Sequence, residues 1–247
     1  MSQLTLENYW ELAPVSIAGI DRVGDLHAQG REEEARDHFI SCARAVWTWR
    51  WTSVRRYTLR RLGEALDVER VPALADIAAG LRAETPGAAA AFLDYLRRRQ
   101  SPDTAGYDCL PDGRIDVGPW ASSLALWQKA AGTGDPAWQE RLAARIAEYL
   151  RPTQVISWHE TIFIYAPLIF SALRHGGIDD ETLCRLVLFG LDYCEQCNLV
   201  AHLSDPPQTS IGGNHLFAMI NPWLEFATLF PEFRRAPVLQ RAAAAVK

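Results

Sequence analysis

The stretch DDETLCRLVLFGLDYCEQCN, residues 179–198, decides the fold class. Its apolar residues recur at steps of three and four positions, namely Leu183, Leu186, Val187, Leu191 and Cys194. This spacing places them on one face of an α-helix. The stretch therefore predicts a helix with a single buried face.

The same spacing recurs along the chain. Behind GTGDP, where we expect Asp135 to cap a helix and Pro136 to be its first residue, the apolar positions are Trp138, Leu142, Ile146, Tyr149 and Leu150. Further helices are predicted near 31–47, 53–66, 71–83, 87–100, 118–131 and 157–175. The segments TQVIS (153–157) and TIFIY (161–165) are rich in β-branched residues, which leaves a strand there as the alternative.

This pattern predicts an all-α fold built from antiparallel helical hairpins. No fixed-period repeat supports a short-motif array. The longest irregular stretch is 101–118, SPDTAGYDCLPDGRIDVG. We expect an N-terminal helical lobe over 1–100, a loop or linker over 101–118 and a second helical portion over 119–247, or else one continuous domain.

The composition of the chain limits the classes of function and the cellular locations that we expect. The 247 residues carry a net charge of -5, which argues against general nucleic-acid binding. No apolar run is long enough to cross a bilayer. The N-terminus lacks the features of a signal peptide, so a cytoplasmic location is expected, or a periplasmic or secreted one if a signal has been removed. Five scattered cysteines suit a reducing compartment, and Cys194 and Cys197 are expected to be structural thiols.

A polar motif stands before an apolar helix near the C-terminus, in SIGGNHLFAMINPW, residues 210–223. Gly212 and Gly213 permit close backbone approach, and Asn214 is a good N-cap residue. Asn214 and His215 are therefore expected at the mouth of a helix. Pro222 is expected to kink or break that helix.

The run SIGGNHLFAMINPWLEFATLFPEFRRAPVLQRAA (210–243), with SWHETIFIYAPLIFSALRHGG (157–177) before it, resembles the helical domain of the heparinase II/III and alginate lyase group of polysaccharide lyases. The likeness is clearest over 155–247. In that group a GNH-like element precedes an apolar helix, an LFPE-like turn and an Ala-rich helix. The resemblance implies an incomplete (α/α) toroid around a cleft that binds an acidic polysaccharide, such as a glycosaminoglycan.

The resemblance also implies β-elimination at a uronic acid, with no cofactor or metal. The C5 proton is weakly acidic, so an amide or a protonated group must bind the carboxylate while a base removes the proton and an acid protonates the departing O4. Asn214 matches the neutralising asparagine, and His215 matches the adjacent histidine. The family's catalytic tyrosine lies on a helix beyond the Ala-rich one, and the printed sequence ends at Lys247. A fragment acting as a non-catalytic glycan-binding or scaffold module is therefore the alternative.

Other side chains are candidates for substrate binding. Trp158, His159 and Glu160 stand at a predicted helix start, where capping is the competing explanation. His202 precedes the GNH element, while His175 before two glycines suits a helix end. Nine tryptophans suit the binding of sugar rings, although a protein interface would explain them equally well. Two arginine clusters, at 50–61 and 97–99, suit the binding of acidic groups, although solvated helix faces are the alternative. A glycoside hydrolase with two carboxylates is a third reading, but no spacing singles out a pair among Asp103, Asp108, Asp112, Asp116 and Glu160.

Overall fold

Contacts within the chain define two compact units. The first comprises Met1–Val54 with Leu191–Lys247, and the second comprises Arg55–Gly190. The computed structural model describes residues 22, 25–26, 28–35, 37–38, 52–53, 56–99, 107–118, 121–150, 154–155, 158–196, 226–237 and 240. Most of these belong to the second unit. The prediction that 101–118 divides the chain into two portions stays a prediction.

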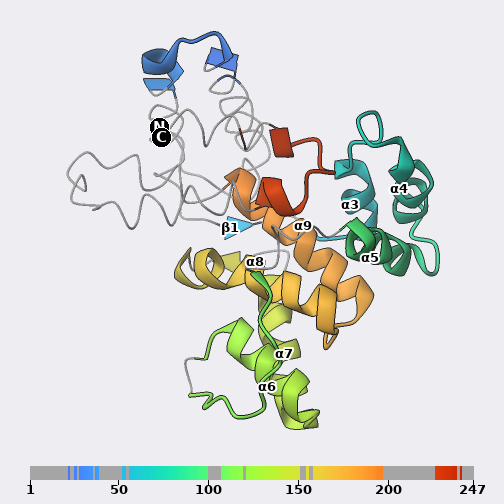
Figure 1. Cartoon of the computed structure of the whole chain (residues 1–247), viewed down its shortest axis with the longest axis vertical. Coiled ribbons are helices and arrows are strands. Elements are labelled where there is room, and N and C mark those ends of the chain that lie inside the picture. The colour runs from blue at the N-terminus through green and yellow to red at the C-terminus, as the bar shows by residue number, and fades with distance from the viewer. Residues whose placement is uncertain are drawn as a thin grey trace. The chain divides into compact units, whose positions relative to one another are not determined.

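The described part of the chain is mostly helical, which confirms the all-α prediction at that level (Figure 1). Two extended pairs of residues, β1 and β2, accompany the helices. TIFIY is helical, so the only extended residues described in that β-branched region are Gln154 and Val155. The elements are β1 (Thr52–Ser53), α3 (Leu59–Ala65), the 3-10 turn η1 (Pro72–Leu74), α4 (Ala75–Arg82), α5 (Ala88–Arg99), α6 (Ser123–Thr133), α7 (Pro136–Tyr149), β2 (Gln154–Val155), α8 (Trp158–His175) and α9 (Asp180–Gln196).

Caps set several of these boundaries. The carboxylate of Asp135 accepts a hydrogen bond from the amide of Ala137 at 2.9 Å, and Pro136 is the first residue of α7, as predicted. The prediction of helix from residue 53 was wrong for the first residues. Thr58 caps α3 by accepting from the amide of Arg61 at 3.3 Å, so the helix begins at Leu59.

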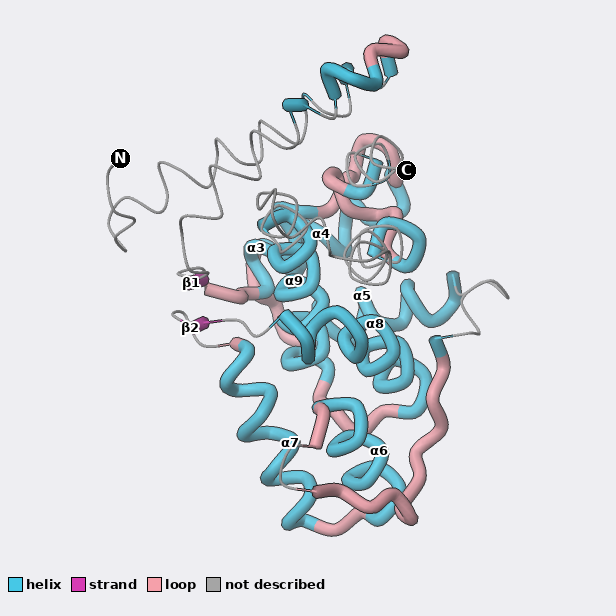
Figure 2. The backbone as a smooth tube through the Cα atoms, turned by 90° about the vertical axis from the view of Figure 1, so that its left-hand side faces the viewer, coloured by secondary structure: helices cyan, strands magenta, loops and turns pink. Residues whose placement is uncertain are grey.

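Helices of the second unit are arranged around α8 and the start of α9. In Figures 1 and 2, α3, α4 and α5 lie on one side of this pair, and α6 and α7 lie on the other. Helix α8 contacts both α5 and α6. The turns between α6 and α7 and between α8 and α9 are short, which agrees with the predicted helical hairpins.

The core of the second unit contains the predicted apolar stripes. Leu183, Leu186 and Val187 of α9 are fully buried, and Leu142 and Ile146 of α7 are nearly so. Burial of these side chains removes their apolar surface from water, at about 25 cal/mol per Å². The largest side chains buried there are Trp127, Phe92, Phe189, Leu62, Leu66, Leu74 and Leu81.

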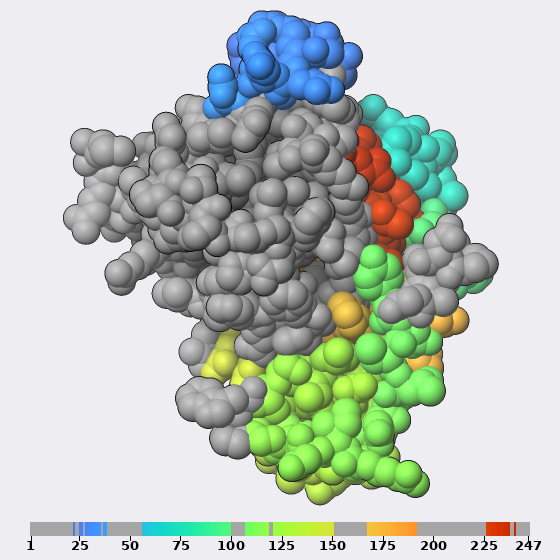
Figure 3. All heavy atoms as spheres, turned by 60° about the vertical axis from the view of Figure 1, so that its left-hand side comes forward, coloured from blue at the N-terminus to red at the C-terminus, as the bar shows by residue number. Residues whose placement is uncertain are grey.

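The irregular segment 107–118 packs alongside α6. The ammonium group of Lys129 donates to the backbone oxygen of Gly113 at 2.6 Å. Gly113 also lies against Gly132, where an added Cβ would fall 2.3 Å from the Gly113 nitrogen, so this approach requires glycine. Residues 107–150 form most of the surface at the bottom of Figure 3, in green to yellow-green.

Candidate functional site

Most of the predicted site residues lie outside the described residues. This holds for Asn214, His215 and His202. The structure places Trp158, His159 and Glu160 at the start of α8, as predicted, but their side chains also lie outside what it describes. The predicted catalytic and substrate-binding contacts therefore stay predictions.

The segment after the GNH element is described from Phe226 onward. Residues 226–229 are helical, 231–235 form turns apart from a bridge residue at 233, and 236–237 are helical again. Three phenylalanines hold this bend together, with ring centroids 5.0 Å apart for Phe226 and Phe230, 5.5 Å for Phe226 and Phe233, and 6.2 Å for Phe230 and Phe233. Such separations suit favourable aromatic contacts.

Glu232 of the LFPE sequence is a buried carboxylate within this bend, only 1% exposed. Carboxylates are rarely so buried unless their charge is compensated. Glu232 was not among the predicted site residues. A signal existed, since a lone acidic residue stands between Phe230 and Phe233.

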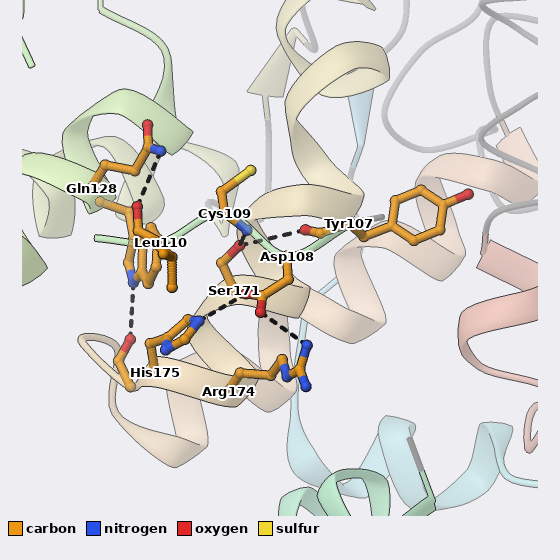
Figure 4. A network of polar contacts seen from close by, with 10 residues as sticks. Tyr107, Asp108, Cys109, Leu110, Gln128, Ser171, Arg174 and His175 are labelled. Atoms are coloured by element: carbon orange, nitrogen blue, oxygen red, sulfur yellow. Dashed lines mark hydrogen bonds and ion pairs between the residues drawn. The ribbon is translucent and has the colours of Figure 1, made fainter. Parts of the chain in front are cut away.

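A polar network joins residues 107–109 to the C-terminal end of α8 (Figure 4). The Asp108 carboxylate accepts a hydrogen bond from Nη1 of Arg174 at 2.9 Å and lies 2.8 Å from Nε2 of His175. The hydroxyl of Ser171 accepts from the amide of Cys109 at 2.8 Å and donates to the backbone oxygen of Tyr107 at 3.5 Å. These bonds anchor the irregular segment on α8.

Cys109 and His175 do not form a pair of nucleophile and base in this network. Figure 4 shows the sulfur of Cys109 directed away from the His175 ring. His175 is the last residue of α8, and Gly176 and Gly177 follow it with φ of 76° and 86°. The predicted role of His175 at a helix end is therefore confirmed, and its Asp108 contact serves the loop.

The indole of Trp127 completes the attachment at this end of α8. It is fully buried, and its Nε1 donates to the backbone oxygen of Gly176 at 2.9 Å. The indole ring also lies 6.3 Å from the His175 ring, centroid to centroid. This tryptophan is thus accounted for by packing rather than by an exposed sugar platform.

The structure describes two free cysteines, Cys109 and Cys184. Cys184 is buried in α9 and its thiol lies 3.7 Å from the backbone oxygen of Ala89. Burial raises the pKa of the Cys184 thiol, chiefly by desolvating the thiolate. Cys109 is a partly exposed free thiol. Within the described ranges, no group of three His, Cys, Asp or Glu side chains is placed to hold a metal ion.

Several clustered arginines have partners within the chain. Arg60 forms an exposed ion pair with Glu64 at 3.1 Å. Arg97 pairs with Asp94 at 2.7 Å and with Asp180 at 3.6 Å, and its Nε donates to the backbone oxygen of Leu173 at 2.9 Å. These contacts favour the solvated-face reading of both residues.

A groove of about 760 Å³ lies between α7 and the beginning of α9. One face of α7 lines one side of the groove, and the turn before α9 with the first residues of α9 lines the other. Arg185 is the single basic side chain among the described lining residues. This groove was not predicted from the sequence. The lining residues are Gln139, Leu142, Ala143, Ile146, Ala147, Leu150, Gly177, Ile178, Asp179, Thr182 and Arg185.

The chain was compared with protein-family models, curated proteins and solved structures, and none of them matched. None of the described helices has both the length and the hydropathy that a bilayer-spanning segment needs.

Proposed function

We propose that the chain is the helical part of a polysaccharide lyase that cleaves a uronate-containing acidic polysaccharide by β-elimination. The observation that carries the proposal is the order of sequence elements over 210–243, in which GNH precedes an apolar stretch with helical spacing, the LFPE sequence and an Ala-rich segment. The local structure agrees where it is described. Helical residues end at Leu229, turns begin at Pro231 and helical residues resume at Ala236.

Helical hairpins also support the proposal. The α6–α7 and α8–α9 pairs are each joined by a short turn, and α8 contacts α6. Stacked hairpins of this kind are the building unit of an (α/α) toroid. An incomplete toroid around a substrate cleft is part of the proposal.

The proposed chemistry follows from the weak acidity of the C5 proton beside an ionised carboxylate. Asn214 donates amide hydrogen bonds to the uronate carboxylate and spreads the charge that develops as the C5–H bond breaks. His215, whose imidazole can act as a base near neutral pH, accepts the C5 proton or contacts the sugar. The electron pair of that C–H bond forms the C4–C5 double bond, and O4 departs with the leaving sugar and takes up a proton.

Two further groups of residues are proposed to bind substrate. Trp158, His159 and Glu160 stand together at the start of α8. An indole face packs against the C–H face of a pyranose ring, while the two polar side chains bind hydroxyl groups. His202 precedes Asn214 by twelve residues and is proposed as another contact.

The test is product formation from alginate, heparan sulfate, hyaluronan and chondroitin sulfate, followed by the ultraviolet absorbance of the unsaturated uronate. Asn214→Ala and His215→Ala are each expected to lower the rate by roughly 10²- to 10⁴-fold. His175→Gln is the matched control, because the structure assigns that histidine to the Asp108 contact. Unchanged activity in an Asn214→Ala, His215→Ala double variant would remove both residues from the mechanism.

Binding separates the lyase from the non-catalytic alternative. The wild-type chain could bind an acidic oligosaccharide, with quenching of tryptophan fluorescence, and form no unsaturated product. That result would indicate a glycan-binding module instead of a lyase. Release of reducing ends without ultraviolet-absorbing product would instead indicate a glycoside hydrolase.

A further inference from the structure

The groove between α7 and α9 has an aliphatic lining along α7. Its α7 residues, at positions 139, 142, 143, 146, 147 and 150, follow helical spacing and form a single stripe. Leu142 and Ile146 are almost fully buried beneath it, whereas Ala143 and Ala147 are exposed. The small alanine side chains leave the space that the groove occupies.

The α9 side supplies the polar groups. Asp179 caps α9, and its carboxylate accepts from the amide of Thr182 at 2.9 Å. Arg185 lies about one helical turn beyond Thr182 on the same face of α9. Its Nε donates to the backbone oxygen of Tyr57 at 2.9 Å, which fixes the guanidinium.

Arg185 has donors to spare. A guanidinium carries five N–H groups, and the bond to Tyr57 uses one of them. Among the described residues, no carboxylate forms an ion pair with Arg185. A half-buried arginine that is held by one edge presents its other edge to a planar oxyanion.

We infer that this groove binds a small aliphatic carboxylate, with its chain along Ala143 and Ala147 of α7 and its carboxylate on Arg185. The volume of about 760 Å³ lies within the usual range of small-molecule sites. The site goes beyond the proposed lyase activity and does not depend on it. No aromatic side chain is among the described lining residues, and the aliphatic surface offers little to sugar hydroxyls.

Octanoate is the probe, and isothermal titration calorimetry of the full chain is the measurement. Wild type is expected to bind octanoate in a 1:1 complex. Arg185→Gln is expected to weaken binding roughly 10- to 100-fold, because it removes a charge-assisted contact. Octanol tests the same point from the ligand side, and its weaker affinity is expected to be unaffected by Arg185→Gln.

A second pair of variants tests the groove by its volume. Ala143→Phe fills the groove and is expected to abolish octanoate binding. Ala144→Phe is the matched control, because Ala144 is also an exposed residue of α7 but does not line the groove. Both variants are checked for an unchanged helical circular dichroism spectrum.

Three results would overturn the inference. They are absence of saturable octanoate binding to wild type, equal affinity for octanol and octanoate, or equal loss of binding in Ala143→Phe and Ala144→Phe. If Arg185→Gln fails to fold, the alanine pair still decides. Lyase activity is not used as a readout, so failure of this site and failure of the lyase proposal are distinguishable.

Discussion

Two adjacent glycines between α8 and α9 provide a matched test of the packing at that turn. Gly176 and Gly177 both have positive φ, at 76° and 86°. A Cβ added at Gly176 would meet no atom within 4 Å. A Cβ added at Gly177 would lie 3.0 Å from Nε1 of Trp127 and 3.2 Å from the Cβ of Ala131.

The expected magnitudes follow from these distances. A left-handed conformation costs an L-residue about 1–2 kcal/mol, and alanine recovers about 0.4–1 kcal/mol by restricting the unfolded chain. Gly176→Ala should therefore lower the free energy of unfolding by about 1 kcal/mol. Gly177→Ala adds an overpacking cost of about 1–3 kcal/mol, because the buried Trp127 indole is held by its bond to Gly176.

The assay is urea unfolding of wild type, Gly176→Ala and Gly177→Ala, followed by circular dichroism. We expect a total loss of about 2–4 kcal/mol for Gly177→Ala, and a melting temperature lower by about 2–4 °C for each kcal/mol. Equal destabilisation of the two variants would refute the proposed contact between residue 177 and Trp127.

Three further predictions concern stability and loop attachment. Because burial raises the pKa of Cys184, the folded chain keeps this thiol protonated while the unfolded chain ionises it above about pH 8.5. The stabilisation is thus present below that pH and is lost as pH rises, so urea unfolding should show wild type losing about 2 kcal/mol between pH 7 and pH 10 relative to Cys184→Ala. A constant difference between the two proteins would contradict this. Ser171→Ala removes the acceptor of the Cys109 amide, so stability should fall by about 1–3 kcal/mol and hydrogen exchange at that amide, measured by mass spectrometry, should accelerate. Unchanged exchange would show that the bond does not hold the loop. Asp135→Ala should lower the unfolding free energy by about 1 kcal/mol, whereas Asp135→Asn keeps a capping oxygen and should lose much less. Equal losses in urea unfolding would argue against the cap.

The helices of the second unit were predictable because their signals are local. Apolar spacing identified the stripe of Leu183, Leu186 and Val187, and the Asp135–Pro136 pair marked the start of α7. The start of α3 was missed because apolar spacing gave no sign of the Thr58 cap. Helix boundaries depend on such single contacts.

The groove and the Asp108 network were not predictable in this way. Periodicity shows that Leu142 and Ile146 face inward, but it does not show which helix faces them. The acceptor of Arg185 is the backbone oxygen of Tyr57, 128 residues away in sequence. The partners of Asp108 are likewise distant, since they lie at the end of α8. Contacts of this kind depend on the tertiary arrangement rather than on local pattern.

The central claim is tested most directly by the chemistry of bond cleavage in water enriched in heavy oxygen. Elimination moves no water oxygen into the sugar and creates one C4–C5 double bond for each chain broken, whereas hydrolysis adds one water oxygen for each. We expect cleaved acidic polysaccharide with a vinyl proton in the NMR spectrum, no more heavy oxygen in the new ends than a reducing oligosaccharide control takes up by exchange, and no product from the Asn214→Ala, His215→Ala double variant. Incorporation of one heavy oxygen for each chain broken, above the exchange in the control, or full activity in the double variant, would contradict the lyase proposal.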